Sequence, residues 1–153
     1  MIKLVASDLD GTLLHNYQQT VPKEIYDTIK ALHEKGIIFT AASGRQYANI
    51  RRLFAPLGFD IPYIAENGSM CVYKEEILAT GLTPSKTIRH ILDALMEYRK
   101  IYHTGHCILS VKDTYYSDST DERFIDYMEN DMHNIVTYVP DLYAIKEPII
   151  KAA

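Results

Sequence analysis

The chain is interpreted outward from Leu4–Leu14, which reads LVASDLDGTLL. The apolar run Ile2–Ala6 predicts a short buried strand, as is typical of a parallel sheet. Asp8 and Asp10 follow it, and Gly11 permits a tight turn with unusual backbone angles directly afterwards. Two neighbouring carboxylates repel each other unless a cation lies between them, and Mg2+ prefers oxygen ligands of this kind. The local chemistry therefore predicts a divalent-metal site with a carboxylate available as nucleophile or base.

A strand, a helix and a second strand are expected around this stretch. Gln18–Gly36 predicts a helix, with Thr20 as its N-cap and Gly36 directly after its last turn. The next strand is expected at Ile37–Ala41, and the helical crossover makes the two strands parallel. Ser43-Gly44-Arg45 then lies at the same sheet edge as the two aspartates. A hydroxyl, a glycine N–H and a helix N-terminus can hold a phosphate, and Arg45 can add a bidentate contact to an oxyanion.

The remaining pattern predicts two units. The first is an α/β unit over residues 1–82, with a mostly parallel sheet and an appended hairpin. The second, over residues 83–153, alternates helix, hairpin, helix and strand, which favours an α+β unit. The further elements expected are a strand at Ile61–Ala65, a turn at Glu66-Asn67-Gly68, a hairpin over Ser69–Thr80, a linker at Gly81–Pro84, a helix from Ser85 to Tyr98, a hairpin joining Cys107–Val111 to Thr114–Ser117, a helix from Ser119 to Met132 and a strand over Tyr143–Ile150.

The composition argues against several classes of protein. Of the 153 residues, 47% are hydrophobic and 24% are charged, which is typical of a globular protein. The formal net charge of −4 argues against nucleic acid or an anionic membrane as the main partner. No apolar run reaches the roughly 18 residues of a membrane span, and the start lacks the apolar region of a secretory signal. We therefore expect a cytoplasmic protein in which Cys71 and Cys107 are reduced thiols rather than a disulfide.

Three segments together resemble one family. Asp8-Leu9-Asp10-Gly11-Thr12-Leu13-Leu14, placed after an apolar strand, resembles the first signature of the haloacid dehalogenase superfamily of phosphohydrolases. Ala41-Ala42-Ser43-Gly44-Arg45 is similar to its second signature, and Glu66-Asn67-Gly68 resembles a segment typical of the Cof-type branch. The resemblance implies a Rossmann-like core over roughly residues 1–82, followed by the first part of an α+β cap that closes over the site.

The resemblance also implies a role for each matching residue. Asp8 would be the nucleophile that forms an aspartyl-phosphate, and Asp10 the general acid and base. One Asp8 oxygen and the Asp10 backbone carbonyl would bind Mg2+. Ser43 and the Gly44 N–H would hold the phosphoryl oxygens. Asn67, and with less support Arg45, would contact the phosphate or the substrate, which is expected to be a small phosphomonoester such as a sugar phosphate.

Two further parts of the family pattern are missing from these residues. The family's third signature is a core lysine, and its fourth is a Gly-Asp acidic cluster that completes the metal site. No Gly-Asp pair occurs in the sequence, and Lys146 and Lys151 lie in cap-like sequence. The expectation is therefore a chain shortened within the cap, with weak Mg2+ binding and little turnover. A homo-oligomer that supplies the missing strands is compatible with an exposed sheet edge.

Other interpretations remain open. Asp8 and Asp10 could be turn-forming carboxylates, Ser43-Gly44-Arg45 a capped helix start with a solvated arginine, and Asn67-Gly68 a plain hairpin turn. A phosphomutase would use the same two aspartates. An inactive module that binds a phosphorylated metabolite or a partner is favoured by the missing lysine and acidic cluster. The gene sequence downstream would separate these: a continuing frame with both parts favours an enzyme, and a stop codon favours the binding module.

Overall fold

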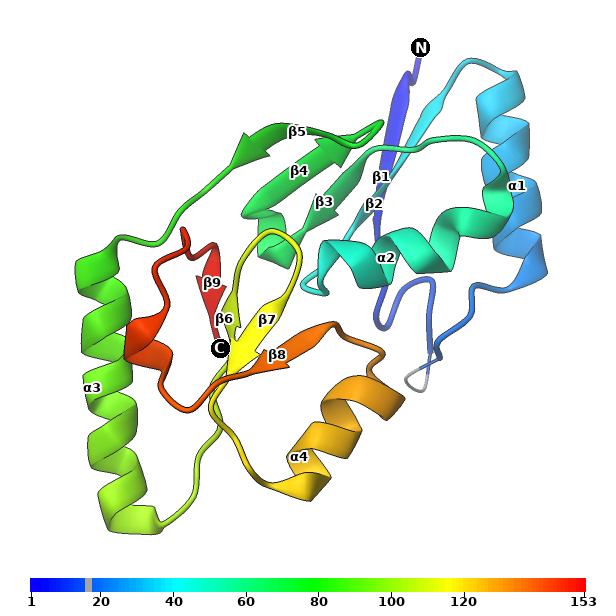
Figure 1. Cartoon of the computed structure of the whole chain (residues 1–153). Coiled ribbons are helices and arrows are strands. Elements are labelled where there is room, and N and C mark those ends of the chain that lie inside the picture. Colours follow the sequence, from blue (N-terminus) through cyan, green and yellow to red (C-terminus); the bar gives the residue numbers. More distant parts are fainter. Residues whose placement is uncertain (16–17) are drawn as a thin grey trace. The chain divides into compact units, whose positions relative to one another are not determined.

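The chain forms two compact units, Met1–Thr80 and Gly81–Ala153. They are seen in a computed structural model that describes residues 1–15 and 18–153 (Figure 1). The predicted fold class is confirmed, because the first unit is an α/β unit built on a parallel-rich sheet and the second mixes a small sheet with helices. Among the described residues, no helix combines the length and the apolar character needed to cross a membrane.

The first unit is organised around a five-stranded sheet in the order β1-β2-β3-β4-β5. Its first three strands are parallel, because each connection between them crosses over through a helix. The last two strands are antiparallel and form the hairpin that the sequence predicts. The strands are β1 (Leu4–Asp8), β2 (Ile38–Ala42), β3 (Tyr63–Ala65), β4 (Met70–Tyr73) and β5 (Glu76–Thr80).

Two crossover helices, α1 (Lys23–Glu34) and α2 (Tyr47–Phe54), pack together beside this sheet. The Tyr26 hydroxyl on α1 donates a hydrogen bond of 2.6 Å to the Leu53 carbonyl on α2. Helix α1 begins later than the sequence predicts, and its N-cap is Pro22 rather than Thr20. Gly36 has a φ of +69° directly after the C-cap, as predicted for a helix that ends on a left-handed residue. Short 3-10 turns follow at Ala55–Leu57 and Glu66–Gly68.

The sheet of the first unit is buried unevenly. Ile29 on α1 and Ile50 and Phe54 on α2 are at most 2% exposed. By contrast, Leu4 and Ile38 are register partners on β1 and β2 and are 53% and 50% exposed. Strand β1 is also an edge strand of this sheet. Within the described residues, the first unit therefore has no strand beyond β1 in its sheet, and it exposes apolar side chains of β1 and β2.

The second unit has a four-stranded sheet in the order β8-β7-β6-β9. The predicted hairpin is present, whereas the strand predicted over Tyr143–Ile150 is wrong. That stretch begins inside a 3-10 turn, contains Pro148, and is followed by a strand only at Lys151. The elements are α3 (Ser85–Tyr102), β6 (Leu109–Ser110), β7 (Tyr115–Ser117), α4 (Glu122–Asp126), a π-helical turn (Tyr127–Asp131), β8 (Val136–Tyr138), a 3-10 turn (Leu142–Ala144) and β9 (Lys151–Ala152).

The core of the second unit lies between α3 and its sheet. Leu92 on α3, Leu109 on β6 and Leu142 are each 1% exposed and belong to one apolar cluster. Cys107 belongs to the same cluster and is a free thiol, and burial raises its pKa to about 11. Cys71, in the first unit, is also free and is half-buried. Both cysteines are therefore reduced, and Cys107 serves as a small apolar core residue.

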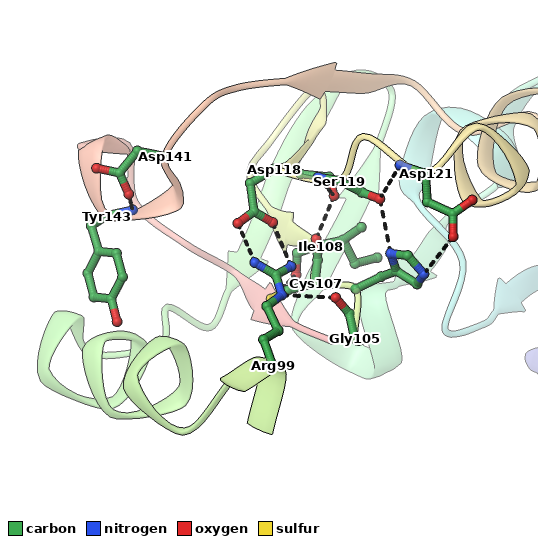
Figure 2. Close-up of polar contacts among 11 residues, drawn as sticks. Arg99, Gly105, Cys107, Ile108, Asp118, Ser119, Asp121, Asp141 and Tyr143 are labelled. Carbon is green, nitrogen blue, oxygen red and sulfur yellow. Dashed lines mark hydrogen bonds and ion pairs between the residues drawn. The ribbon is translucent and has the colours of Figure 1, made fainter. Parts of the chain in front are cut away.

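A polar network joins the C-terminal end of α3 to the residues after β7 (Figure 2). The Arg99 guanidinium makes two hydrogen bonds to the Asp118 carboxylate, at 2.6 and 2.8 Å, and donates a third to the Gly105 carbonyl at 2.9 Å. The pair is largely buried, with side chains 23% and 9% exposed. Hydrogen bonding to Arg99 lowers the pKa of Asp118, and the same bond raises the pKa of Arg99. The network therefore fixes the end of α3 against the sheet.

We expect Asp118→Asn to lower the free energy of unfolding of the second unit by about 1.5–3 kcal/mol, because it leaves a largely buried guanidinium without its anionic partner. The pKa of Asp118 in the folded unit lies below its ordinary 3.8, so its stabilisation is present above that pH and is lost as pH falls through the folded value. Urea unfolding followed by NMR signals of the second unit at pH 7 and at pH 2 measures both effects.

The matched control for this experiment is Glu97→Gln. Glu97 pairs with Lys100 on the surface of α3, where both side chains are about 70% exposed. Its replacement should therefore lower the free energy of unfolding by about 0.5 kcal/mol or less. If Asp118→Asn lowers the free energy of unfolding as little as Glu97→Gln does, or equally at pH 7 and pH 2, the Arg99–Asp118 pair does not stabilise the second unit as described.

Candidate active site at the carboxyl end of the parallel strands

The register of β1 and β2 brings the first two predicted segments together. Asp8, the last residue of β1, is the register partner of Ala42, the last residue of β2. Ser43 follows directly, and its N–H donates a hydrogen bond of 2.8 Å to the Ile64 carbonyl on β3. Neighbouring strands lie about 4.8 Å apart, so Asp8 and the Ser43 loop share the same edge of the sheet.

The loop after β1 is shaped by its own backbone. Leu9 is fully buried, and its carbonyl accepts hydrogen bonds from the N–H groups of Thr12, Leu13 and Leu14 at 2.8–3.2 Å. Gly11 has a φ of +83°, a conformation that side chains disfavour, and its N–H donates to the Leu14 carbonyl at 2.8 Å. The Asp8 and Asp10 side chains, on either side of buried Leu9, are both exposed. The loop thus presents two carboxylates on a backbone that holds its shape without them.

Two other loops are joined to each other at this edge by main-chain hydrogen bonds. The Asn67 N–H donates to the Ser43 carbonyl, and the Glu66 N–H donates to the Arg45 carbonyl, both at 3.2 Å. Glu66 and Asn67 both have left-handed φ values, 54° and 58°, which turn the chain sharply after β3. The Asn67 side chain lies so close to the Gly44 Cα that a Cβ at position 44 would collide with its amide oxygen. Gly44 therefore permits the close approach of the two loops.

Arg45 is directed at the aspartate loop. Its Nε and Nη2 donate hydrogen bonds to the two Asp10 carboxylate oxygens, at 3.0 and 2.6 Å. The Arg45 side chain is only 5% exposed, whereas that of Asp10 is 50% exposed. Nη1 donates to the Gln19 and Asn49 side-chain oxygens at 3.1 and 3.3 Å, and Nη2 also makes a long contact of 3.5 Å with the Gln18 carbonyl. The guanidinium is thus buried among protein oxygens.

The six predicted site residues lie at this one edge, with Asp8 at the end of β1 and the others in the loops that follow the strands: Asp10, Ser43, Gly44, Arg45 and Asn67. Their chemical roles stay predictions. The Ser43 hydroxyl oxygen accepts a hydrogen bond of 3.1 Å from the Arg45 N–H, which leaves its own proton to donate.

Sequence reasoning missed two partners of Arg45, Asn49 and Gln19. Asn49 lies four residues after Arg45 and is 1% exposed. A polar residue next to the apolar positions of α2 could have indicated a buried hydrogen-bonding partner. Gln19 lies 26 residues before Arg45 in a loop and had no local signal.

The residues present fit Mg2+ in kind but form only a partial set. Carboxylate and carbonyl oxygens are the ligands that this ion prefers, and it retains several waters when few protein ligands are available. Within the described part of the chain, no group of three or more His, Cys, Asp or Glu side chains could hold a metal ion. The Asp10 carboxylate is engaged with Arg45, whereas the Asp8 side chain is exposed.

Comparison with known proteins gives one family. A family profile described as haloacid dehalogenase-like hydrolase matches residues 5–153. Phosphoglycolate phosphatase 1 of Saccharolobus solfataricus is 39% identical over 77 residues, which cover 50% of this chain and 34% of that protein. Phosphoglycolate phosphatase of Staphylothermus marinus is 34% identical over 102 residues, which cover 65% of this chain and 42% of that protein.

Solved structures share the fold. A haloacid dehalogenase-like hydrolase from B. subtilis superposes with a TM-score of 0.78 at 21% identity, over 97% of this chain and 59% of that one. The matches thus span less than half of the two phosphoglycolate phosphatases and somewhat more than half of the solved structure.

We expect Gly44→Ala to destabilise the first unit by about 1–3 kcal/mol, because the new methyl group must displace the Asn67 side chain from between the two loops. Asn67→Gly, which keeps the left-handed backbone accessible, should remove most of that cost when combined with Gly44→Ala. Thermal unfolding of the two single variants and the double variant measures this coupling. Strictly additive effects would show that the two loops do not meet as described.

Proposed function

We propose, from the premise that this chain belongs to the haloacid dehalogenase-like hydrolase family, that the edge formed by β1 and β2 is a phosphomonoester hydrolase site. The observation that carries the proposal is the register pair Asp8 and Ala42, which puts an exposed carboxylate beside the Ser43-Gly44 loop. In this proposal Asp8 supplies the nucleophile, and Ser43 and Gly44 of the neighbouring loop supply the O–H and N–H donors. Such an arrangement suits phosphoryl transfer, in which positioning and charge stabilisation do most of the work.

In the proposed reaction, an Asp8 carboxylate oxygen attacks phosphorus and the bond from phosphorus to the leaving alkoxide breaks. Protonated Asp10 gives its proton to that alkoxide. Water then attacks the aspartyl-phosphate, Asp10 takes a proton from the water, and the bond between phosphorus and Asp8 breaks to release inorganic phosphate. Ser43, through its hydroxyl, and Gly44, through its N–H, hold the phosphoryl oxygens, and Asn67 contacts the phosphate from the adjacent loop.

Asp8 and the Asp10 backbone carbonyl are the groups proposed to hold Mg2+. When bound, this ion neutralises charge on the phosphoryl oxygens and on the nucleophile. Because the described residues offer only a partial ligand set, we expect the chain to bind Mg2+ weakly and to turn over slowly.

The proposed substrate is a small phosphorylated metabolite of the size of a sugar phosphate. The two relatives described above are both named phosphoglycolate phosphatases, which supports a small monoester. Residues 83–153 are proposed to form the first part of the cap. A second candidate, a module that binds a phosphorylated metabolite without turnover, is favoured by the same partial ligand set.

We expect the chain to hydrolyse a chromogenic phosphomonoester slowly in the presence of Mg2+, and Asp8→Asn to abolish that turnover, since the amide is a much poorer nucleophile. Chelation of the metal should have the same effect. The assay measures phenolate release with wild-type chain and variants prepared in parallel.

Asp60→Asn serves as the matched control, since Asp60 is an exposed aspartate of the same unit outside the proposed site. Turnover that survives Asp8→Asn refutes the nucleophile assignment. Binding of inorganic phosphate at the Gly44 amide without any turnover would favour the binding module instead.

A further inference from the structure

The N–H donors of the Arg45 guanidinium are all directed at oxygen atoms of the protein. A guanidinium carries five N–H donors: one on Nε and two on each terminal nitrogen. In this chain Nε donates to one Asp10 oxygen, and Nη2 donates to the other and makes the long contact with the Gln18 carbonyl. Nη1 donates to Gln19 and Asn49. Five contacts therefore account for five donors, and the side chain is 5% exposed.

We infer that Arg45 is a positioning residue for Asp10 and not a ligand of the substrate phosphate; this inference rests on the proposed function of the site. A phosphate ligand needs donors aimed at the volume beside Asp8, whereas those of Arg45 are directed at protein oxygens. Its two shortest contacts are made to the two Asp10 oxygens, in the bidentate geometry that guanidinium and carboxylate favour. Asp10 is thus held in one orientation while its side chain stays half exposed, within reach of a leaving group.

The anchoring of Arg45 supports this role. Asn49 is 1% exposed and lies near the start of α2, and Gln19 contributes an oxygen from the loop before α1. The backbone on both sides of Arg45 is fixed as well, because its N–H donates to the Ser43 hydroxyl oxygen and its carbonyl accepts from Glu66. Gln19 and Asn49 thus fix one terminal nitrogen of the guanidinium, and the contacts with Asp10 extend to the proposed site.

Steady-state kinetics separates the two roles of Arg45. If it positions Asp10, Arg45→Met should lower kcat by about 10- to 100-fold, which does not exceed the contribution of general acid–base catalysis. The KM and the inhibition constant of inorganic phosphate should change by less than about twofold. Arg45→Lys, which keeps a charge but loses the fork, should recover part of the lost kcat. A rise of about tenfold in KM and in the phosphate inhibition constant, with kcat retained, would overturn the inference.

A double-variant cycle tests whether Arg45 acts through Asp10. In an Asp10→Asn background, Arg45→Met should lower kcat by less than about twofold further, since the group that Arg45 orients is already inactive. Equal effects of Arg45→Met in both backgrounds would contradict the inference. Asn49→Ala removes one anchor of Arg45 and should give a smaller loss of kcat, which covers the case in which Arg45→Met does not fold.

Arg52→Met is the matched control for the kinetic variants. Arg52 is exposed and also donates to Gln19, at 3.2 Å, whereas the hydrogen bonds to Asp10 in the described part of the chain come from Arg45. Its replacement should leave kcat and KM unchanged. A loss of kcat equal to that of Arg45→Met would show that the Gln19 loop, rather than the Asp10 contact, is responsible.

NMR of the Arg45 Nε–H group gives a readout that does not depend on turnover. Its signal should shift in Asp10→Asn and stay in place in Arg52→Met. Addition of inorganic phosphate with Mg2+ should move the Gly44 amide signal and leave Arg45 Nε–H in place. Movement of the Arg45 signal together with that of Gly44 would overturn the inference. A Gly44 signal that does not respond to phosphate would instead count against the proposed function. In that case the Asp10→Asn comparison decides the role of Arg45.

Discussion

The parallel pairing of β1 with β2 is the constraint on which the rest of the site depends. Because Asp8 is paired with Ala42, the two strands end at the same level, and the loops that leave them share one edge. A shift of the pairing by one residue would turn every side chain of β1 to the other face of the sheet. The helical crossover through α1 enforces the parallel direction, so the proximity of Asp8 and Ser43 follows from the topology before any side-chain contact is made.

Main-chain hydrogen bonds hold the loops at this edge. The Leu9 carbonyl accepts hydrogen bonds from three N–H groups of its own loop. The Ser43 and Arg45 carbonyls accept hydrogen bonds from N–H groups of the loop after β3. A loop that is shaped by its backbone leaves its side chains available for chemistry, which is how rigid scaffolds commonly present reactive groups. The left-handed conformations at Gly11, Glu66 and Asn67 are part of the same arrangement, since each turns the chain within one or two residues. Left-handed residues other than glycine, here Glu66 and Asn67, often occur at functional sites.

The sequence predicts the elements that follow regular patterns. Alternation of apolar strands with an amphipathic helix identifies β1, α1 and β2, and Gly36 marks the end of α1 because a left-handed residue is needed there. In the second unit, short strands defeat the same reasoning. Strand β8 has three residues and β9 has two, too few to show a period, and both are defined by partners distant in the chain. The apolar residues around Pro148 therefore suggested a strand where the chain is irregular.

The sequence predicted which loops meet at this edge but not which side chains pair there. Asp8, Asp10 and the Ser43-Gly44-Arg45 segment could be placed at one edge because loops that follow neighbouring parallel strands meet there, whereas Asn67 was a candidate through the family resemblance alone. The pairing of Arg45 with Asp10 was not visible, since it depends on side-chain reach across 35 residues of chain and on Gln19 and Asn49 behind the guanidinium. A buried arginine without a carboxylate partner would cost several kcal/mol, so the folded unit itself holds Asp10 in place. Under the proposed function, the orientation of Asp10 is therefore supplied before a substrate binds, which is the condition under which a preorganised polar site lowers a reaction barrier.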